Sequence, residues 1–215
     1  MSSREQILND VRQALGRKPG QPPAAQPKAR IVIPSLTMEE RIRLFQERLE
    51  VLGGKVHRAA TYQDAAGVVG ELLQGETAVA SNAPALRHAG VSAMPNVSSG
   101  YGDEPSLRAA CASAPFGITG ADYGLAETGS IVTIAANEAR LVSLLPPVHI
   151  ALLSKARMLT GLDEFYTLHP QPARQSASTV FITGPSRSAD IEMILVRGVH
   201  GPRVIHVIVI DEELI

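Results

Sequence analysis

The residues best suited to chemistry stand on one turn, Ala126-Glu-Thr-Gly129, between two apolar runs rich in β-branched residues. Glu127 is the carboxylate of this turn, and Thr128, Gly129 and Ser130 offer hydroxyl and backbone N–H groups beside it. An ionisable group between buried strands costs stability unless it is paired, so such a turn is a candidate site. We expect Glu127 to act as a base or nucleophile, or to bind a cation or a hydroxyl group. A plain surface carboxylate is the competing interpretation.

The glycines of residues 117–129 match neither a dinucleotide-binding fingerprint nor a P-loop, because the required spacing and the Gly-Lys-Ser/Thr element are missing. One interpretation is that they serve tight turns that need positive φ angles. The other is that the turn faces a crevice at the end of a strand, where open α/β sheets bind ligands. In that case Thr119 and Gly120 join Thr128, Gly129 and Ser130 as ligand-binding residues.

A second polar turn follows a later apolar run, at Thr183-Gly-Pro-Ser186 with Asp190 four residues on. Free N–H groups and hydroxyls at a strand-to-helix turn suit a carboxylate or a phosphate group. We therefore predict that Thr183, Gly184, Ser186 and Asp190 bind the ligand. The alternative is a helix start that Ser186 or Ser188 caps, with no ligand.

Two histidines are candidate partners of these turns. His200 stands between small residues in Gly198-Val-His-Gly-Pro202, and His149 alternates with apolar neighbours after a Pro-Pro pair. A lone histidine in such a setting is structural more often than catalytic. The hypothesis is that Glu127 and His200 are catalytic and meet in one hollow at the rim of a sheet, with His149 and Gly201 among the ligand-binding residues.

Charge and cysteine content exclude several classes of protein. The 20 Lys and Arg residues nearly cancel the 21 Asp and Glu residues, so no large field favours nucleic acid or an anionic membrane. The small net charge also offers little resistance to forming a homo-oligomer. Cys111 is the single cysteine, so this chain alone can form no disulfide, Cys-based zinc site or iron–sulfur cluster. Small neighbours predict that its thiol is packed, and we expect no metal or cofactor on this chain.

The amino-terminal region reads as a helix followed by an arm. A capping box at Ser3 opens a short amphipathic helix that ends at Gly16, and residues 17–34 hold five prolines. The segment lacks the apolar core of a signal peptide, and the longest apolar runs fall far short of the ~20 residues that span a bilayer. We predict a cytoplasmic protein without a membrane span. The helix is close to the lower length limit for stability alone, so we expect it to dock on its own domain, a sister subunit or a partner.

The main domain is predicted to occupy residues 35–215, after a helix-and-arm region at 1–34. Capping boxes at Thr37 and Thr61 each open a helix, and strands alternate with the helices that follow. This rhythm predicts an α/β fold with a mostly parallel sheet flanked by helices. Helices are expected at 84–90 and 105–112, and strands at 56–59, 77–80, 116–119, 130–135, 148–153, 179–183 and 204–210.

Four ordered motifs across residues 116–210 resemble the signature of the lactate utilization (LUD) domain family. They are Ile118-Thr-Gly-Ala-Asp with Ala126-Glu-Thr-Gly-Ser130, Leu145-Pro-Pro-Val-His149, Thr183-Gly-Pro-Ser186 with Ala189-Asp-Ile-Glu192, and Gly198-Val-His-Gly-Pro202. The amino-terminal helix and Pro-rich arm fit the same family.

The resemblance implies a fold similar to the ribose-phosphate isomerase, glucosamine-6-phosphate deaminase and CoA-transferase superfamily. It also implies a subunit of a lactate oxidation complex that converts L-lactate to pyruvate with iron–sulfur partner proteins. On this expectation the chain itself has no redox centre and takes a small organic acid as ligand. The alternative is a stand-alone enzyme of CoA-transferase or sugar-phosphate isomerase type that acts on a phosphorylated or CoA-linked acid. Glu127 resembles the acyl-accepting glutamate of CoA transferases in form only.

Overall fold

A computed structural model describes residues 3–18, 20–22, 34–134, 140–176, 178–188, 196–198 and 200–213. The chain forms two compact units, Met1–Val32 and Ile33–Ile215. In the first unit, helix α1 (Ser3–Ala14) buries none of its residues. Asp190 and the tail of the second polar motif lie outside the described residues.

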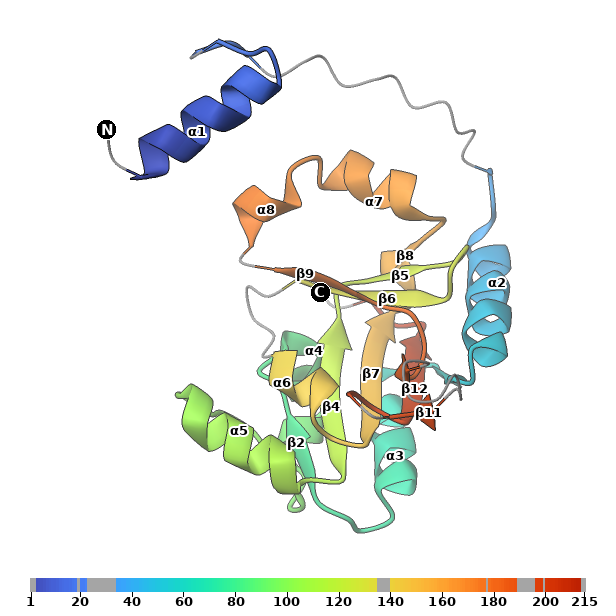
Figure 1. The fold of residues 1–215 in the computed structure, drawn as a ribbon. Helices are drawn as coiled ribbons and strands as arrows, with labels where there is room; N and C mark the ends of the chain where they lie inside the picture. Colours follow the sequence, from blue (N-terminus) through green and yellow to red (C-terminus); the bar gives the residue numbers. More distant parts are fainter. Residues whose placement is uncertain are drawn as a thin grey trace. The chain divides into compact units, whose positions relative to one another are not determined.

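In its described residues, the second unit contains the four predicted helices, α2 to α5, and three more, α6 to α8, that the sequence analysis did not predict (Figure 1). They are α2 (Met38–Val51), α3 (Tyr62–Leu73), α4 (Pro84–His88), α5 (Glu104–Ser113), α6 (Arg140–Leu144), α7 (Leu162–Leu168) and α8 (Pro172–Gln175), with short 3₁₀ turns at Val91–Ala93 and Lys155–Arg157. Thr37 and Thr61 cap α2 and α3 through complete capping boxes with Glu40 and Asp64, which confirms both predicted helix starts.

The main sheet has six strands in the order β1-β12-β7-β4-β2-β3, and each neighbouring pair is parallel. These strands are β1 (Lys55–Ala59), β2 (Ala78–Ala80), β3 (Val97–Ser98), β4 (Phe116–Ala121), β7 (Val148–Ser154) and β12 (Val204–Ile210). Strands β7, β4 and β12 form the centre, and their near-continuous apolar sequences suit burial on both faces. The predicted α/β fold with a mostly parallel sheet is confirmed.

A second sheet of four strands, in the order β8-β5-β6-β9, continues from the end of the first. Its strands are β5 (Tyr123–Leu125), β6 (Ser130–Ile134), β8 (Met158–Leu159) and β9 (Thr179–Ile182). Strands β5 and β6 are antiparallel, so the Ala126–Gly129 turn is a hairpin turn of this second sheet. A short antiparallel pair, β10 (Arg187–Ser188) and β11 (Val196–Arg197), stands apart from both sheets.

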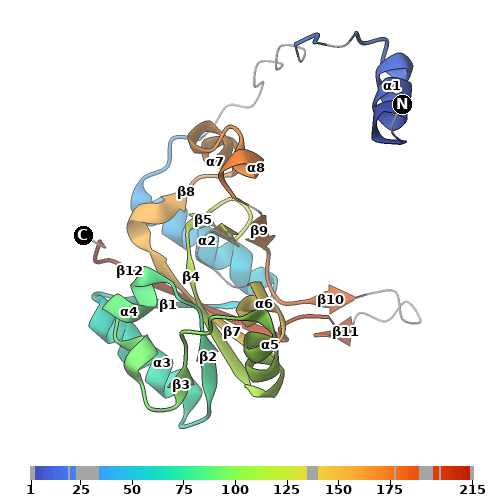
Figure 2. The ribbon, with the colours of Figure 1, turned by 90° about the vertical axis from the view of Figure 1, so that its left-hand side faces the viewer.

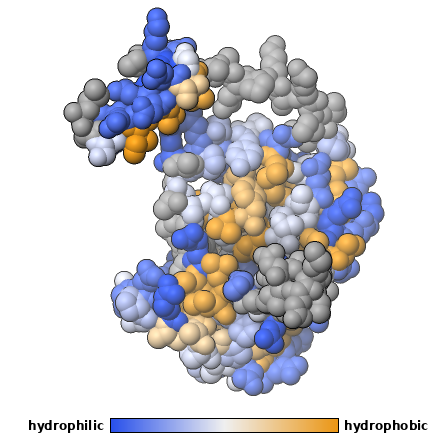
Figure 3. All heavy atoms as spheres, in the orientation of Figure 1, coloured by the Kyte–Doolittle hydropathy of each residue, from blue (hydrophilic) through white to orange (hydrophobic). Residues whose placement is uncertain are grey.

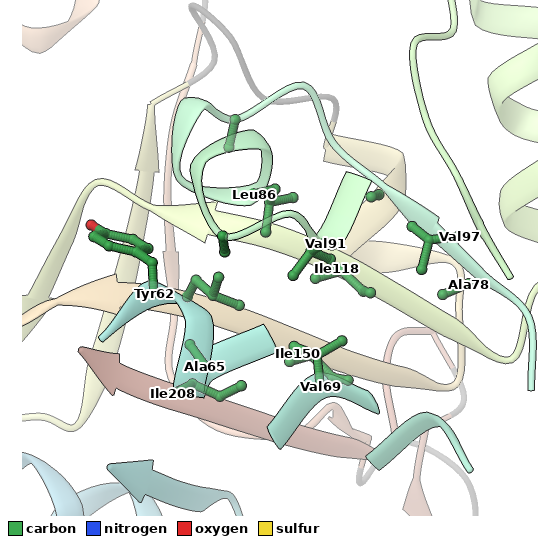
Figure 4. Packing of buried hydrophobic residues seen from close by; sticks show 14 of the residues in the cluster. Tyr62, Ala65, Val69, Ala78, Leu86, Val91, Val97, Ile118, Ile150 and Ile208 are labelled. Carbon is green, nitrogen blue, oxygen red and sulfur yellow. The ribbon is translucent and has the colours of Figure 1, made fainter. Parts of the chain in front are cut away.

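Helices cover both faces of the six-stranded sheet, with α3 and α4 on one face and α5 and α6 on the other (Figure 2). On the first face, Tyr62, Val69 and Leu86 pack against Ile118, Ile150 and Ile208 of the strands (Figure 4). On the other face, α2 packs Ile42, Phe45 and Leu49 against β12 and β7, and against Ile131 of the second sheet. Helix α7 covers the outer face of the second sheet through Phe165.

Cys111 of α5 is buried with Val79 and Val142 in a smaller cluster. The thiol is packed as predicted, and burial raises its pKa, which disfavours the reactive thiolate.

Candidate functional site

The carboxyl ends of the parallel strands meet at one edge of the six-stranded sheet, and a cavity of about 560 Å³ opens there. It lies over the ends of β4 and β7, next to the amino end of α4. This edge is where open α/β sheets bind ligands, and the volume is in the range that encloses small molecules. We call it the carboxyl-edge cavity. Its polar lining residues include Asp122, Tyr123, Ser154, Arg157, His169 and Glu213.

The Tyr123 hydroxyl joins a cation to an imidazole in this cavity. It accepts a hydrogen bond from Nη1 of Arg157 at 3.3 Å, and it lies 2.9 Å from Nε2 of His169. The guanidinium carbon of Arg157 is 5.5 Å from the centre of the Tyr123 ring, which fits a cation–π contact. Arg157 can bind a carboxylate or a phosphate, and the phenol can pass a proton to or from His169.

Asp122 lies between β4 and β5 at the floor of this cavity. Its Oδ2 accepts a hydrogen bond from the backbone N–H of Ile134 at 2.6 Å. Burial raises the pKa of Asp122, although this hydrogen bond and the positive charge of Arg157 act in the opposite direction. A carboxyl group with a raised pKa beside a tyrosine and a histidine is typical of sites that handle protons.

A second cavity, of about 580 Å³, lies at the opposite edge of the same sheet. Pro147 and Arg203, which come just before the amino ends of β7 and β12, line this cavity. The backbone N–H of Arg203 donates a hydrogen bond to Pro147 O at 2.8 Å. We call it the amino-edge cavity. His200 and Gly201, two residues predicted from the sequence, line it.

Glu127 lines neither cavity. Its side chain lies against Gly161, where an added Cβ would collide with Oε2, and its backbone N–H donates to Thr160 O at 2.9 Å. Glu127 follows β5, beyond the carboxyl end of β4, whereas His200 lies before the amino end of β12. The structure therefore does not bring these two residues into one hollow, and their catalytic roles stay predictions.

Three of the predicted hydroxyl residues do come together. Oγ of Ser130 lies 2.7 Å from Oγ1 of Thr128 and 2.8 Å from Oγ1 of Thr183, so the two polar motifs meet. The glycines next to them contact α2 closely: a Cβ on Gly129 would lie 2.5 Å from Leu49 N, and Gly184 packs on Leu52. These contacts attach the hairpin turn to α2.

The other predicted residues are distributed between the core and the two edges. Gly120 lines the carboxyl-edge cavity, whereas Thr119 and His149 are buried within the sheet and line neither cavity; Oγ1 of Thr119 lies 2.9 Å from Nε2 of His149. Burial lowers the pKa of His149 to about 4. Ser186 donates its backbone N–H to Pro202 O at 2.9 Å, which places it beside Gly201 and the amino-edge cavity.

Sequence reasoning missed the residues that line the carboxyl-edge cavity most fully. Asp122 and Tyr123 come directly after β4, and Arg157 comes soon after β7. Neighbouring parallel strands end at the same edge of a sheet, so polar residues directly after two predicted strands indicate a ligand site at that edge. This pattern was the sequence signal for Asp122, Tyr123 and Arg157. His169 gave no such signal, because it comes from the end of α7, 46 residues after Tyr123.

Among the described residues, no group of three or more His, Cys, Asp and Glu side chains could hold a metal ion. Nor does any helix of the described ranges combine the length and apolar character needed to cross a bilayer.

Comparison with known sequences gives a family match over most of the chain. The model of the LUD domain matches residues 42–210. Lactate utilization protein C 1 of Bacillus mycoides is 30% identical over 99% of both chains. Lactate utilization protein C of Halalkalibacterium halodurans is 45% identical over 104 residues, which span 46% of this chain but only 45% of that relative.

The fold also has a counterpart among solved structures. A crystal structure of a DUF162 family protein from Deinococcus radiodurans matches with a TM-score of 0.62 and 21% identity, covering 82% of this chain and 100% of that one. At this identity the likeness concerns the fold.

Proposed function

The chain belongs to the LUD domain family, and from this membership we propose that it functions in the utilization of L-lactate. The observation that carries the proposal is the alignment with lactate utilization protein C 1 of Bacillus mycoides, which extends over 99% of both chains. In this proposal the chain is a subunit that works with iron–sulfur partner proteins in oxidising L-lactate to pyruvate. In this system the partner proteins transfer the electrons, and this chain binds the organic acid.

The lining of the carboxyl-edge cavity supports the proposal that this chain binds the organic acid. Arg157 offers a guanidinium group to a carboxylate, which it can bind through two hydrogen bonds. Tyr123, already hydrogen-bonded to His169, is placed to exchange a proton with the 2-hydroxyl or 2-oxo group of such an acid. Lactate occupies only part of a 560 Å³ cavity, so the remainder is open to a partner or a second molecule.

Growth on lactate tests the proposal. A strain that lacks the gene should not grow on L-lactate as the sole carbon source, and the wild-type gene should restore growth. Arg157→Gln should fail to restore it, because the variant loses the charge that binds the carboxylate. Arg174→Gln, which changes an exposed arginine of α8, is the matched control and should restore growth. Normal growth of the deletion strain on lactate would contradict the proposal.

The partner part is tested separately. The tagged chain, recovered from lactate-grown cells, should bring down iron-containing proteins, with iron measured in the eluate. Recovery of the chain alone, without iron, would remove the iron–sulfur partners from the proposal and leave the lactate growth result unaffected.

A further inference from the structure

The amino-edge cavity carries an inference of its own, because its lining combines an apolar wall with cationic side chains. Leu141, Leu144 and Leu145 of α6 and the loop after it form the wall, together with Pro147. Leu144 and Leu145 are 42% and 41% exposed, so their apolar surface is in contact with solvent. Figure 3 shows this apolar surface over α6, beside the more hydrophilic α5.

Arg203 supplies a positive charge on the other side of this cavity. Its side-chain stem lies over Gly198, where any Cβ would collide with Cγ of Arg203. Gly198 has a φ of 75°, a conformation that suits glycine, so the turn leaves space for the arginine. Among the described residues no carboxylate forms an ion pair with this guanidinium.

His200 stands beside Arg203 in the lining and is exposed. Its imidazole can donate a further hydrogen bond to an anionic oxygen. Gly198 and Gly201, which also line this side of the cavity, contribute no side chains of their own. A cationic end and an apolar wall therefore face one space of about 580 Å³.

We propose that the amino-edge cavity is a second ligand site, which binds a carboxylate carried on an apolar chain of several carbons. Arg203 and His200 hold the carboxylate, and the leucines of α6 cover the chain. A polar acid as small as lactate would leave the leucine wall in contact with water, whereas a longer acid removes that apolar surface from water. The inference does not depend on lactate utilization, because it concerns a different cavity at the opposite edge of the sheet.

Calorimetric titration of the full chain with butyrate, hexanoate and octanoate tests the proposal. Burial of each methylene group tightens binding by about fourfold when burial is complete, so from butyrate to octanoate the Kd should fall by about tenfold or more. Octanamide, which has the same chain without the charge, should bind at least about tenfold more weakly than octanoate. Equal affinity for butyrate and octanoate would overturn the proposal.

Variants locate the site. Arg203→Gln should weaken octanoate binding about tenfold and reduce the preference for octanoate over octanamide. Leu144→Asp should reduce the dependence on chain length. Arg174→Gln and Leu168→Asp are matched changes at exposed positions of α8 and α7, and they should leave the Kd unchanged. Circular dichroism and thermal unfolding verify that each variant is folded.

The variant Arg157→Gln shows which of the two cavities octanoate occupies. If octanoate binds but responds to Arg157→Gln and not to Arg203→Gln, the ligand occupies the carboxyl-edge cavity and the proposal is wrong. If octanoate binding survives Arg157→Gln and is lost with Arg203→Gln, the amino-edge site is supported. This holds whether or not the strain needs the protein for growth on lactate.

Discussion

His149 is a buried imidazole near the amino end of β7, a central strand of the six-stranded sheet. Its exposed fraction is 0%, and Nε2 shares a hydrogen bond with Thr119. Nδ1 has no hydrogen-bond partner among the described residues. A protonated ring in this position would bring an uncompensated charge into the core, and burial accordingly lowers the pKa of His149 to about 4. We infer that the histidine stays neutral at physiological pH.

The pH dependence of stability follows from this burial. The unfolded chain binds a proton on His149 below pH 6.5, while the folded chain does so only near pH 4. The stabilisation that comes from the lowered pKa of His149 is therefore complete above pH 6.5. It is lost as the pH falls toward 4, which lowers the free energy of unfolding by about 3 kcal/mol. Urea unfolding of the wild type and of His149→Gln, between pH 4 and 7, should show a smaller pH slope for the variant.

His206 also has its pKa lowered to about 4 by burial and by the positive charges of His57 and Lys55, so the wild type has a second source of the same slope. Because His206 is unchanged in His149→Gln, the difference between the two curves reports His149. Parallel curves would contradict a neutral His149 in the folded state.

The hairpin turn between β5 and β6 shows how an element limits which residues are available for chemistry. Gly129 has a φ of 65°, and its Cα faces the backbone of α2 so closely that a Cβ would lie 2.5 Å from Leu49 N. Ser130 is hydrogen-bonded to Thr128 and Thr183 at the same place. The contacts of this motif therefore hold the second sheet against α2.

Gly129→Ala should lower the free energy of unfolding by about 2–5 kcal/mol. A positive φ costs a residue with a Cβ about 1–2 kcal/mol, and the collision with α2 adds about 1–3 kcal/mol. Gly100→Ala is the matched control, because Gly100 has a φ of 80° with nothing within 4 Å of an added Cβ. Chemical unfolding of both variants measures the difference, and equal losses would show that the approach to α2 does not matter.

Local patterns predicted the elements whose signal is contained in a few neighbouring residues. Threonine followed three residues later by an acidic residue gave the starts of α2 and α3, and the long apolar run gave β12. Strands of two or three residues, such as β5 and β8, carry too short a pattern and exist through pairing with distant segments. Sequence analysis therefore predicted β6 and β9 and the turn that holds Glu127, but it missed β5 and β8 and did not show that these four strands form a separate sheet.

The same limit applies to the sites. The fold brings together Tyr123, Arg157 and His169, although 46 residues separate the first from the last. No rule based on spacing in the sequence predicts this proximity. By contrast, His200 and Gly201 were singled out because glycines flank the histidine, and both line a cavity. Sequence reasoning thus found residues with unusual neighbours in the chain, and missed those whose neighbours are assembled by the fold.

At the scale of the whole unit Ile33–Ile215, the parallel sheet separates two cavities. Strand β7 leads from Pro147, in the lining of the amino-edge cavity, to Ser154, in the lining of the carboxyl-edge cavity. Seven residues of extended chain span roughly 20 Å, with buried side chains between the two ends. A ligand at one edge therefore has no contact with a ligand at the other.

We expect the two cavities to bind their ligands independently. Direct competition is impossible across roughly 20 Å, and coupling would need a rearrangement of the close-packed sheet. The Kd for octanoate should therefore change by less than about twofold when L-lactate saturates the carboxyl-edge cavity. Calorimetric titration with octanoate, with and without saturating L-lactate, measures this change, and Arg157→Gln serves as a control that no longer binds lactate. Stoichiometric displacement of octanoate by lactate would mean that both acids share a single cavity, and the assignment of two separate sites would fall.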